Sequence, residues 1–145
     1  MRIDGEWFEC DDGVLRPVIR GVVQNATGDW EPMLFLVDTG ADRTVFSAAA
    51  FNTLGFDPSD ESTRIGGIGG IVHSVNVPTS IRLVRDDGGV VAFRSTYAAF
   101  TQLESLDISV LGRDVMALFS VIVDRPNRKV VLVRDQHRYE IHSSA

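Results

Sequence analysis

The feature that most constrains this chain is the apolar run Met33-Leu34-Phe35-Leu36-Val37, which leads straight into Asp38-Thr39-Gly40-Ala41. A short apolar run bounded by turn residues is typical of a buried β-strand. Such a strand delivers the Asp38 carboxylate to the floor of the fold, and Gly40 lets the backbone turn sharply there. Aspartate, threonine and glycine are also common turn residues, so the motif on its own favours an ordinary turn. The segments around it decide between a turn and a site.

Strand patterns dominate the rest of the chain. Val14–Val23 is rich in valine and isoleucine, and the turn composition Asn25–Asp29 separates it from the Met33 run, which predicts a hairpin. Pro17 cannot donate to a ladder, so we expect its strand at an edge or on a bulge. Asp86-Asp87-Gly88-Gly89 predicts a tight turn between two more strands. We expect these and the remaining strands at Ile81–Val84, Val90–Phe100, Ile108–Leu111, Ser120–Val123, Val130–Val133 and Tyr139–His142.

Two short helices interrupt the strand patterns. Ser47 before Ala48–Leu54, with Gly55 after it, is typical of a helix capped at both ends. Gly112-Arg113-Asp114 opens a second helical stretch from about Val115 to Phe119. A chain of 145 residues with 44% hydrophobic content is long enough for one good core and short for two. We therefore expect an all-β fold with one or two short helices, in a single domain over residues 1–145.

Composition argues against several classes of function. A net charge of −6 and a pI near 4.9 disfavour binding to nucleic acid or to an anionic membrane. The single cysteine, Cys10, and the lack of clustered histidines provide no metal-ligand spacing, so we expect no metal and no cofactor. The acidic N-terminus Met1–Asp12 does not resemble a secretory signal, and no apolar run is long enough to span a membrane. We expect a cytoplasmic location.

Two further segments change the interpretation of the Asp38 motif. In Ile65-Gly66-Gly67-Ile68-Gly69-Gly70, paired glycines separated by isoleucine predict a hairpin tip that can fold over a cleft, although a plain glycine-rich loop is the alternative. The spacing fits neither a dinucleotide-binding nor a phosphate-binding loop. In Leu111-Gly112-Arg113, a buried strand ends in a glycine and a cation. That cation either returns beneath the Asp38 loop to pair with Asp42 or lies exposed on a helix.

In this order, the three segments resemble the retropepsin family of aspartic proteases, over about residues 33–119. The resemblance implies a closed barrel or sandwich of the acid-protease type that forms a symmetric homodimer, with the N-terminal hairpin and C-terminal strands packed on the 33–119 core. In that family each subunit gives one aspartate to a dyad that binds the attacking water. The resemblance therefore implies that Asp38 is catalytic only in a dimer and that the substrate is a protein or peptide.

The resemblance also assigns roles to the neighbouring residues. The active-site loop is Thr39, Gly40 and Ala41, with Thr39 hydrogen-bonded across the two-fold axis. Structural support comes from Asp42, Gly112 and Arg113. The residues implied to bind substrate are Gly40, Ala41, Asp42, Gly67, Ile68 and Gly69. Apolar pockets are expected at Ala41, Ile65, Ile68, Ile71 and Leu111, although apolar residues at strand spacing are as often core.

The sequence departs from the viral members of the family in two places. It continues well beyond Phe119, with strand patterns that resemble cellular and bacterial members, so the dimer sheet is expected to differ from interleaved viral termini. Asp114 stands where the viral pattern has an amide, and its position is typical of a helix cap. Two other functions remain open: a dimeric module that binds extended peptides without cutting them, and a hydrolase with paired carboxylates in one chain, such as a glycosidase.

Overall fold

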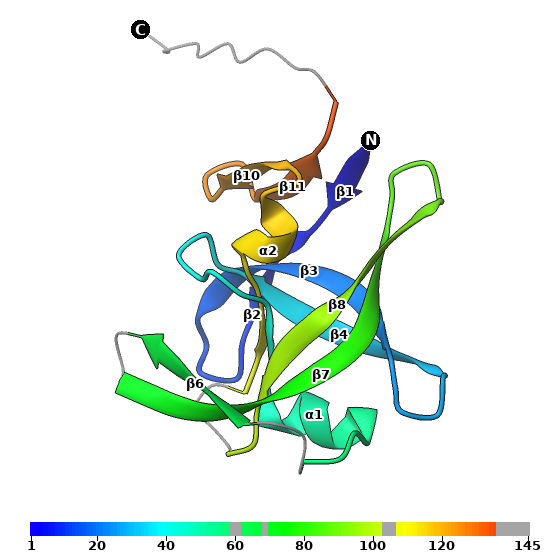
Figure 1. Cartoon of the computed structure of the whole chain (residues 1–145). Coiled ribbons are helices and arrows are strands. Elements are labelled where there is room, and N and C mark those ends of the chain that lie inside the picture. The colour runs from blue at the N-terminus through cyan, green and yellow to red at the C-terminus, as the bar shows by residue number, and fades with distance from the viewer. Residues whose placement is uncertain (59–61, 68–69, 103–106, 136–145) are drawn as a thin grey trace, which may run out of the picture.

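The structure is a computed structural model that describes residues 1–58, 62–67, 70–102 and 107–135, with the backbone alone for 62–67 and 70–73 (Figure 1). Strands account for most of these residues, and the two helices are short, which confirms the expected fold class. The helices are α1 (Ala48–Leu54) and α2 (Arg113–Met116). The strands are β1 (Arg2–Asp4), β2 (Glu6–Glu9), β3 (Leu15–Gln24), β4 (Trp30–Val37), β5 (Val45–Phe46), β6 (Ser62–Gly67), β7 (Gly70–Val84), β8 (Val90–Phe100), β9 (Ser109–Leu111), β10 (Ser120–Asp124) and β11 (Lys129–Val133).

The main sheet closes into a barrel. Its strand order is β2-β3-β4-β9-β5-β8-β7-β6, and β3 also pairs with β7 through Val22↔Arg82 and Val23↔Ile81. That extra pairing joins β3, β4, β9, β5, β8 and β7 into a ring, with β2 and β6 hydrogen-bonded outside it. The long twisted ribbons of β7 and β8 cross the front of the ring in Figure 1. The closed barrel expected from the family resemblance is confirmed.

Aromatic side chains fill part of the barrel interior. Phe35, Phe46 and Tyr97 are at most 2% exposed, and the Phe46 ring centroid lies 6.2 Å from that of Phe35 and 5.6 Å from that of Tyr97. Tilted ring pairs at these separations stabilise a core by about 0.5–1.5 kcal/mol beyond the area they bury. The Tyr97 hydroxyl donates to the carbonyl of Phe93 at 2.8 Å, so its burial leaves no polar atom unpaired.

Strand β9 determines where the Asp38 loop lies. It pairs in parallel with β4 through Leu36↔Val110 and Val37↔Leu111, and antiparallel with β5 through Val45↔Val110. The chain therefore leaves β4 at Asp38, crosses the carboxyl end of β9, and returns as β5 on its other side. This arrangement places the 38–44 loop directly over residues 111–114.

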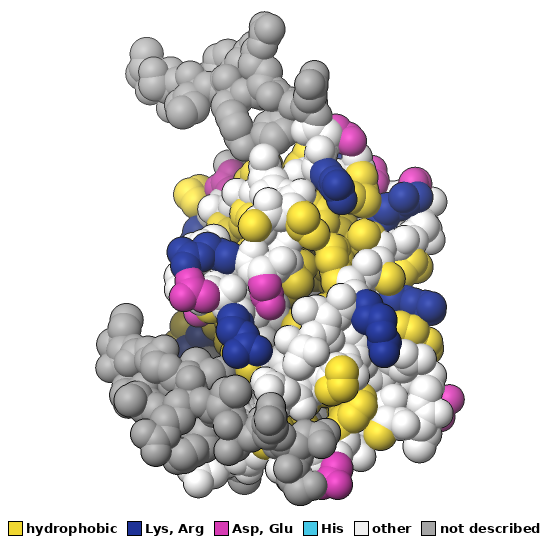
Figure 2. Space-filling view, viewed as in Figure 1, with side chains coloured by type: hydrophobic (Ala, Val, Ile, Leu, Met, Phe, Trp, Pro, Cys, Tyr) yellow, Lys and Arg dark blue, Asp and Glu magenta, His cyan; other side chains and the backbone are white. Residues whose placement is uncertain are grey.

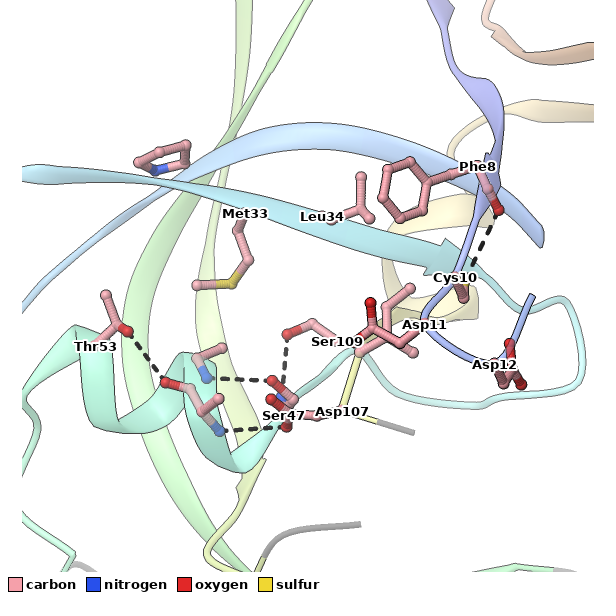
Figure 3. A pocket seen from close by; sticks show the side chains of 14 residues that line it. Phe8, Cys10, Asp11, Asp12, Met33, Leu34, Ser47, Thr53, Asp107 and Ser109 are labelled. Carbon is pink, nitrogen blue, oxygen red and sulfur yellow. Dashed lines mark hydrogen bonds between the residues drawn. The ribbon is translucent and has the colours of Figure 1, made fainter. Parts of the chain in front are cut away.

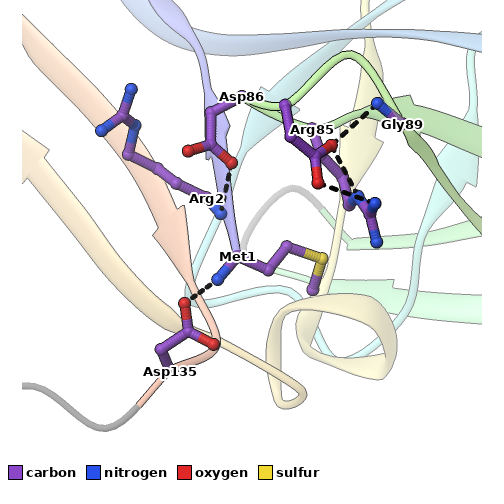
Figure 4. A network of polar contacts seen from close by, with 7 residues as sticks. Met1, Arg2, Arg85, Asp86, Gly89 and Asp135 are labelled. Carbon is purple, nitrogen blue, oxygen red and sulfur yellow. Dashed lines mark hydrogen bonds and ion pairs between the residues drawn. The ribbon is translucent and has the colours of Figure 1, made fainter.

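A second sheet joins the two ends of the chain, with strand order β1-β11-β10. Ile3 of β1, opposite Leu132 of β11, is 1% exposed. The Met1 ammonium pairs with the carboxylate of Asp135, and the Arg2 amide donates to an Asp86 carboxylate oxygen at 3.1 Å (Figure 4). The first strand thus pairs with β11, the last strand among the described residues, and with the turn of the β7–β8 hairpin.

The structure confirms some of the local features expected from the sequence and contradicts others. Helix α1 is capped as expected, because the Ser47 hydroxyl oxygen accepts from the Ala50 amide at 3.2 Å and Gly55 takes a left-handed φ of 73°. The second helix starts at Arg113, two residues before the expected Val115. The edge position expected for the strand that holds Pro17 is wrong, since β3 lies between β2 and β4. The ladder with β4 begins only at the next residue, so Pro17 has a strand neighbour on one side alone.

The strands expected over 108–111, 120–123 and 130–133 and the β7–β8 hairpin are confirmed. The strand expected at Tyr139–His142 lies outside the described residues. On the face shown in Figure 2, Lys and Arg side chains are separated from one another and interspersed with acidic and apolar ones. Within the described part of the chain, neither helix is long and apolar enough to cross a membrane.

Candidate active site

Asp38 lies at the end of β4, half-buried beneath an exposed loop. Its amide donates to the carbonyl of Leu111 at 3.2 Å, which extends the β4–β9 ladder to the first residue of the loop. The Gly40 amide donates to Asp38 Oδ1 at 3.0 Å and orients the carboxylate. Thr39 and Gly40 are themselves exposed. The carboxylate is therefore held at the floor of an open surface, as the apolar run before it predicted.

Backbone hydrogen bonds from the segment after β9 hold the middle of the loop. The Arg113 amide donates to the Ala41 carbonyl at 2.8 Å, and the Asp114 amide donates to the Asp42 carbonyl at 3.2 Å. These bonds make the loop and the first turn of α2 one hydrogen-bonded unit. Asp38 is thus carried by two segments that are far apart in sequence.

Gly112 allows this unit to form because it leaves room for the loop. A Cβ built at this position would lie 2.3 Å from the carbonyl carbon of Arg43 and 2.5 Å from its oxygen. The backbone at Gly112 is extended, with φ −99° and ψ −177°, which any residue adopts. Close approach of two backbones, and not conformational freedom, is the reason that glycine is needed here.

The structure brings Arg113 and Asp42 together in an ion pair. In the single chain their side chains are 57% and 80% exposed, so the pair is also at the surface. Exposed pairs of this kind contribute about 0–1 kcal/mol to stability. The sequence offered two alternatives for Arg113, pairing with Asp42 or exposure on a helix. The structure shows both, because the paired side chains are exposed.

Asp114 is not the helix cap that its position suggested. The cap residue of α2 is Gly112, and the Asp114 carboxylate instead accepts from Thr44, through the amide at 2.9 and 3.0 Å and the hydroxyl at 2.7 Å. The Thr44 hydroxyl oxygen in turn accepts from the Gly112 amide at 3.1 Å. Thr44 is fully buried and was missed from the sequence, where the only signal was the carboxylate at position 114 in place of an amide.

The Asp114 carboxylate also affects the pKa of Tyr97. Burial of its hydroxyl, with the negative charge of Asp114 as a second cause, raises the pKa of Tyr97 to about 12. The phenol therefore stays neutral throughout the pH range in which peptidases act. In the described part of the chain, no three histidine, cysteine, aspartate or glutamate side chains gather in a group that could hold a metal ion.

The glycine-rich segment forms the expected hairpin. Strands β6 and β7 pair in an antiparallel ladder from Ser62↔Val75 to Gly67↔Gly70. The tip, with Ile68 and Gly69, lies outside the described residues. Leu111 is fully buried in the core, so its expected role in a substrate pocket is wrong. Its side chain belongs to the barrel interior because it lies on the face of β9 that packs into the hydrophobic core.

A hollow of about 390 Å³ lies between β4, α1 and the β2–β3 turn (Figure 3). Met33 and Leu34 of β4 face it from one side and Ser47 and Thr53 from the helix side, with Phe8 at one end. No residue of 38–42 lines it. This hollow is separate from the Asp38 loop, where the single chain shows an open surface.

Comparison with known proteins identifies the family. Residues 23–115, from the end of β3 into α2, match the family described as aspartyl protease. The chain belongs to that family. The matched residues of this aspartyl protease family member include the Asp38 loop, the β6–β7 hairpin and the whole 111–115 segment. The retropepsin-like membership predicted from the three segments is confirmed, and it supports a protease-type hydrolase function.

A solved structure shares the fold of this family member. A retropepsin-like aspartic protease from Rickettsia conorii has a TM-score of 0.59 and 22% identity, over 91% of this chain and 90% of that one. EIAV protease complexed with the inhibitor HBY-793 has a TM-score of 0.46 and 23% identity, over 70% of this chain and 86% of that one. No curated protein sequence matched the chain.

Proposed function

We propose that this protein is an aspartic endopeptidase that hydrolyses peptide bonds of extended polypeptides, with Asp38 of two identical chains forming the catalytic dyad. The observation that carries the proposal is the half-buried Asp38 carboxylate at the end of β4. Backbone hydrogen bonds join Asp38, Ala41 and Asp42 of its loop to Leu111, Arg113 and Asp114. Such preorganisation is what a reacting group needs, because catalysis depends on geometry held before the substrate arrives.

The dyad follows from the chemistry of two neighbouring carboxylates. Two like charges about 4 Å apart repel by roughly 4 kcal/mol at an effective dielectric constant near 20, so the pair retains one proton. The ionised carboxylate takes a proton from water as general base. The protonated one donates to the peptide carbonyl oxygen and stabilises the charge that develops there. The enzyme forms no covalent bond with the substrate in this reaction.

A second copy supplies the other half of the site. One chain offers a single Asp38, and the surface around it is exposed at Thr39, Gly40, Asp42 and Arg43. Thr39 hydrogen-bonds across the two-fold axis to the facing loop. Contact with the second copy also buries the Arg113–Asp42 pair, so that removal of one partner leaves an uncompensated charge in the assembly.

The substrate lies extended between the two loops and the two β6–β7 hairpins. Main-chain hydrogen bonds hold it as an added strand, and alternate side chains enter apolar pockets. Gly40, Ala41 and Asp42 contact it from below, and Gly67, Ile68 and Gly69 from the hairpin. Selectivity is broad and mainly hydrophobic.

Replacement of Asp38 by Asn tests the assignment. With a diverse peptide library across pH, Asp38→Asn lowers turnover by at least about 10²–10⁴-fold, the usual contribution of acid–base catalysis. Asp11→Asn, which removes an exposed carboxylate outside the loop, retains full activity. Peptide binding by the wild type without any product would contradict the proposal and support a binding module.

Mixed dimers test whether the site is shared. Wild-type and Asp38→Asn subunits are unfolded together, refolded at constant total concentration and assayed. If each active dimer needs two Asp38 residues, a 1:1 mixture keeps about a quarter of the wild-type activity. A mixture with Asp11→Asn subunits keeps all of it. Retention of half the activity in the Asp38→Asn mixture would show that each chain acts alone.

A further inference from the structure

We propose that the hollow between β4, α1 and the β2–β3 turn is a second binding site, which takes a tyrosine side chain next to a lysine or arginine in a segment of polypeptide. None of the residues 38–42 lines this hollow. The proposal therefore goes beyond the peptidase function and stands or falls independently of it. The walls, the floor and the rim of the hollow each match one part of that ligand.

The walls of the hollow are apolar. Small residues of α1, Ala49 and Ala50, line one side, and the Met33 side chain points toward the helix from β4 across the gap (Figure 3). The volume of about 390 Å³ is near the lower end of the range for ligand sites, roughly 300–1,000 Å³, so one or two side chains fit. An aromatic ring suits these walls, because a methionine sulfur makes favourable contacts with it.

Two buried hydroxyl groups lie at the floor. Ser47 is 7% exposed and Ser109 is 2% exposed. The Ser47 hydroxyl oxygen accepts from the Ala50 amide at 3.2 Å, and the Ser109 hydroxyl oxygen accepts from the Ser47 amide at 3.0 Å. Within the described part of the chain, neither hydroxyl has an acceptor for its own hydrogen. Both can donate to a ligand, and a phenol carries an oxygen that accepts at the far end of an aromatic ring.

Carboxylates lie at the rim. Among the described residues that line the hollow, every charged side chain is an aspartate. Asp12 is paired with Arg16, whose guanidinium donates to its two oxygens at 2.8 and 2.7 Å. Asp107 is exposed, and its Oδ1 accepts from the Ala49 amide at 3.4 Å. Its second oxygen is open to a cation, so a lysine or arginine beside the tyrosine finds an opposite charge there.

The exposed rim favours a polypeptide over a free small molecule. Asp107, Ala49 and Thr53 are exposed at the opening, whereas Ser47 and Ser109 are buried beneath it. Small-molecule sites bury about 70–90% of their ligand. A hollow that is open at the rim instead takes one side chain and leaves the attached backbone outside. An aromatic anchor in a pocket with charged groups at its edge is a common arrangement at protein–protein interfaces.

Peptide titration followed by NMR tests the proposal. The probe is acetyl-Gly-Gly-Tyr-Arg-Gly-Gly amide, and the full chain carries Asp38→Asn so that the proposed dyad cannot cut it. We expect saturable shifts at the amides of Ser47, Ala49 and Ser109, with a Kd below about 1 mM. Phenylalanine in place of the probe's tyrosine weakens binding about 3- to 10-fold, because the phenol oxygen is lost. Glutamate in place of its arginine weakens binding about 3- to 10-fold through repulsion by the rim.

Two variants with matched controls locate the peptide. Ala49→Leu fills the hollow and weakens binding by about 10- to 100-fold, the usual effect of losing the burial of one large side chain. Asn52→Leu adds the same side chain to an exposed position of α1 that does not line the hollow, and leaves the Kd unchanged. Asp107→Asn keeps the oxygen that accepts from Ala49 and weakens binding about 2- to 5-fold. Glu9→Gln, which removes an exposed carboxylate that does not line the hollow, has no effect.

Cys10 provides a second measure of occupancy. It is the only cysteine of the chain, lines the hollow and is 7% exposed. The peptide at about ten times its Kd is expected to slow alkylation of the Cys10 thiol by iodoacetamide about tenfold, because the occupied hollow excludes the reagent. The same peptide with alanine in place of tyrosine leaves the rate unchanged.

Neither measurement depends on cleavage, so an inactive wild type would contradict only the proposed peptidase function. Absence of saturable shifts up to about 5 mM peptide would overturn the proposed site. Shifts confined to residues 38–42, with unchanged alkylation of Cys10, would also overturn it, because the peptide would then bind at the Asp38 loop. Wild-type affinity in folded Ala49→Leu would have the same meaning.

Discussion

Gly112→Ala sets two effects of opposite sign against each other. Gly112 has an ordinary extended backbone, and replacing such a glycine by alanine normally stabilises a protein by about 0.4–1 kcal/mol through the unfolded state. The added Cβ, however, would lie 2.3 and 2.5 Å from the carbonyl atoms of Arg43. These are backbone atoms of a hydrogen-bonded loop, so they cannot rotate away.

The magnitudes favour destabilisation. Overpacking of a tight site costs about 1–3 kcal/mol, and displacement of the loop weakens the Gly112–Thr44 hydrogen bond by about 1 kcal/mol more. After subtraction of the gain through the unfolded state, we expect Gly112→Ala to lower the free energy of unfolding by about 1–3 kcal/mol. Turnover falls with it, because the displaced loop carries Asp38.

Gly89→Ala provides the matched control. The Cβ there would also be crowded, at 2.4 Å from a guanidinium nitrogen of Arg85. That atom is the end of a flexible side chain, and its exposed pair with Asp87 contributes about 0–1 kcal/mol. We therefore expect Gly89→Ala to remain within about 1 kcal/mol of the wild type.

Urea unfolding followed by circular dichroism at one fixed protein concentration measures both variants. The fixed concentration matters because formation of the proposed dimer would be linked to folding. If Gly112→Ala were as stable as the wild type, the close approach of the loop to residue 112 would be refuted, whatever the outcome at Gly89.

Three further predictions concern other contacts. Arg113→Ala lowers the free energy of unfolding of the single chain by less than about 1 kcal/mol. The same variant weakens the proposed dimer, which sedimentation experiments measure. An unchanged dimer would show that the pair with Asp42 stays exposed. Ser47→Ala removes the α1 cap and destabilises the protein by about 1 kcal/mol in the same urea assay. The raised pKa of Tyr97, about 12, stabilises the fold fully below pH 10, and this contribution is lost as the pH rises toward 12. Phenolate absorbance of Tyr139→Phe, in which Tyr97 is the remaining tyrosine, measures that titration, and ionisation near pH 10 in the folded protein would contradict it.

Local patterns were sufficient to predict the elements that surround the site. The apolar run before Asp38 predicted β4, because a strand needs only its own side chains to indicate burial. Ser47 and Gly55 predicted both ends of α1, because caps are made within one turn. The pairing of Arg113 with Asp42 was one of two alternatives that the sequence offered, because a buried strand ends there in a glycine and a cation.

Other features left no local signal. The sequence around Thr44 is that of an ordinary loop. The hydrogen-bond partner of its buried hydroxyl is Asp114, which is 70 residues away in sequence. Leu111 was expected in a pocket because its own side chain cannot reveal which face of β9 the barrel covers. The N-terminal strand β1 was not predicted, since its partner β11 lies at the other end of the chain.

The same distinction between local sequence patterns and tertiary contacts applies to Asp38. The sequence by itself determined that a carboxylate follows a buried strand, that a glycine permits the turn after it, and which family this pattern belongs to. The tertiary structure alone decided what supports that carboxylate. Parallel pairing of Val37 with Leu111 and closure of the barrel through β3 and β7 bring Gly112 and Asp114 beneath the loop. Such pairings depend on packing between distant segments, which local residue patterns do not record.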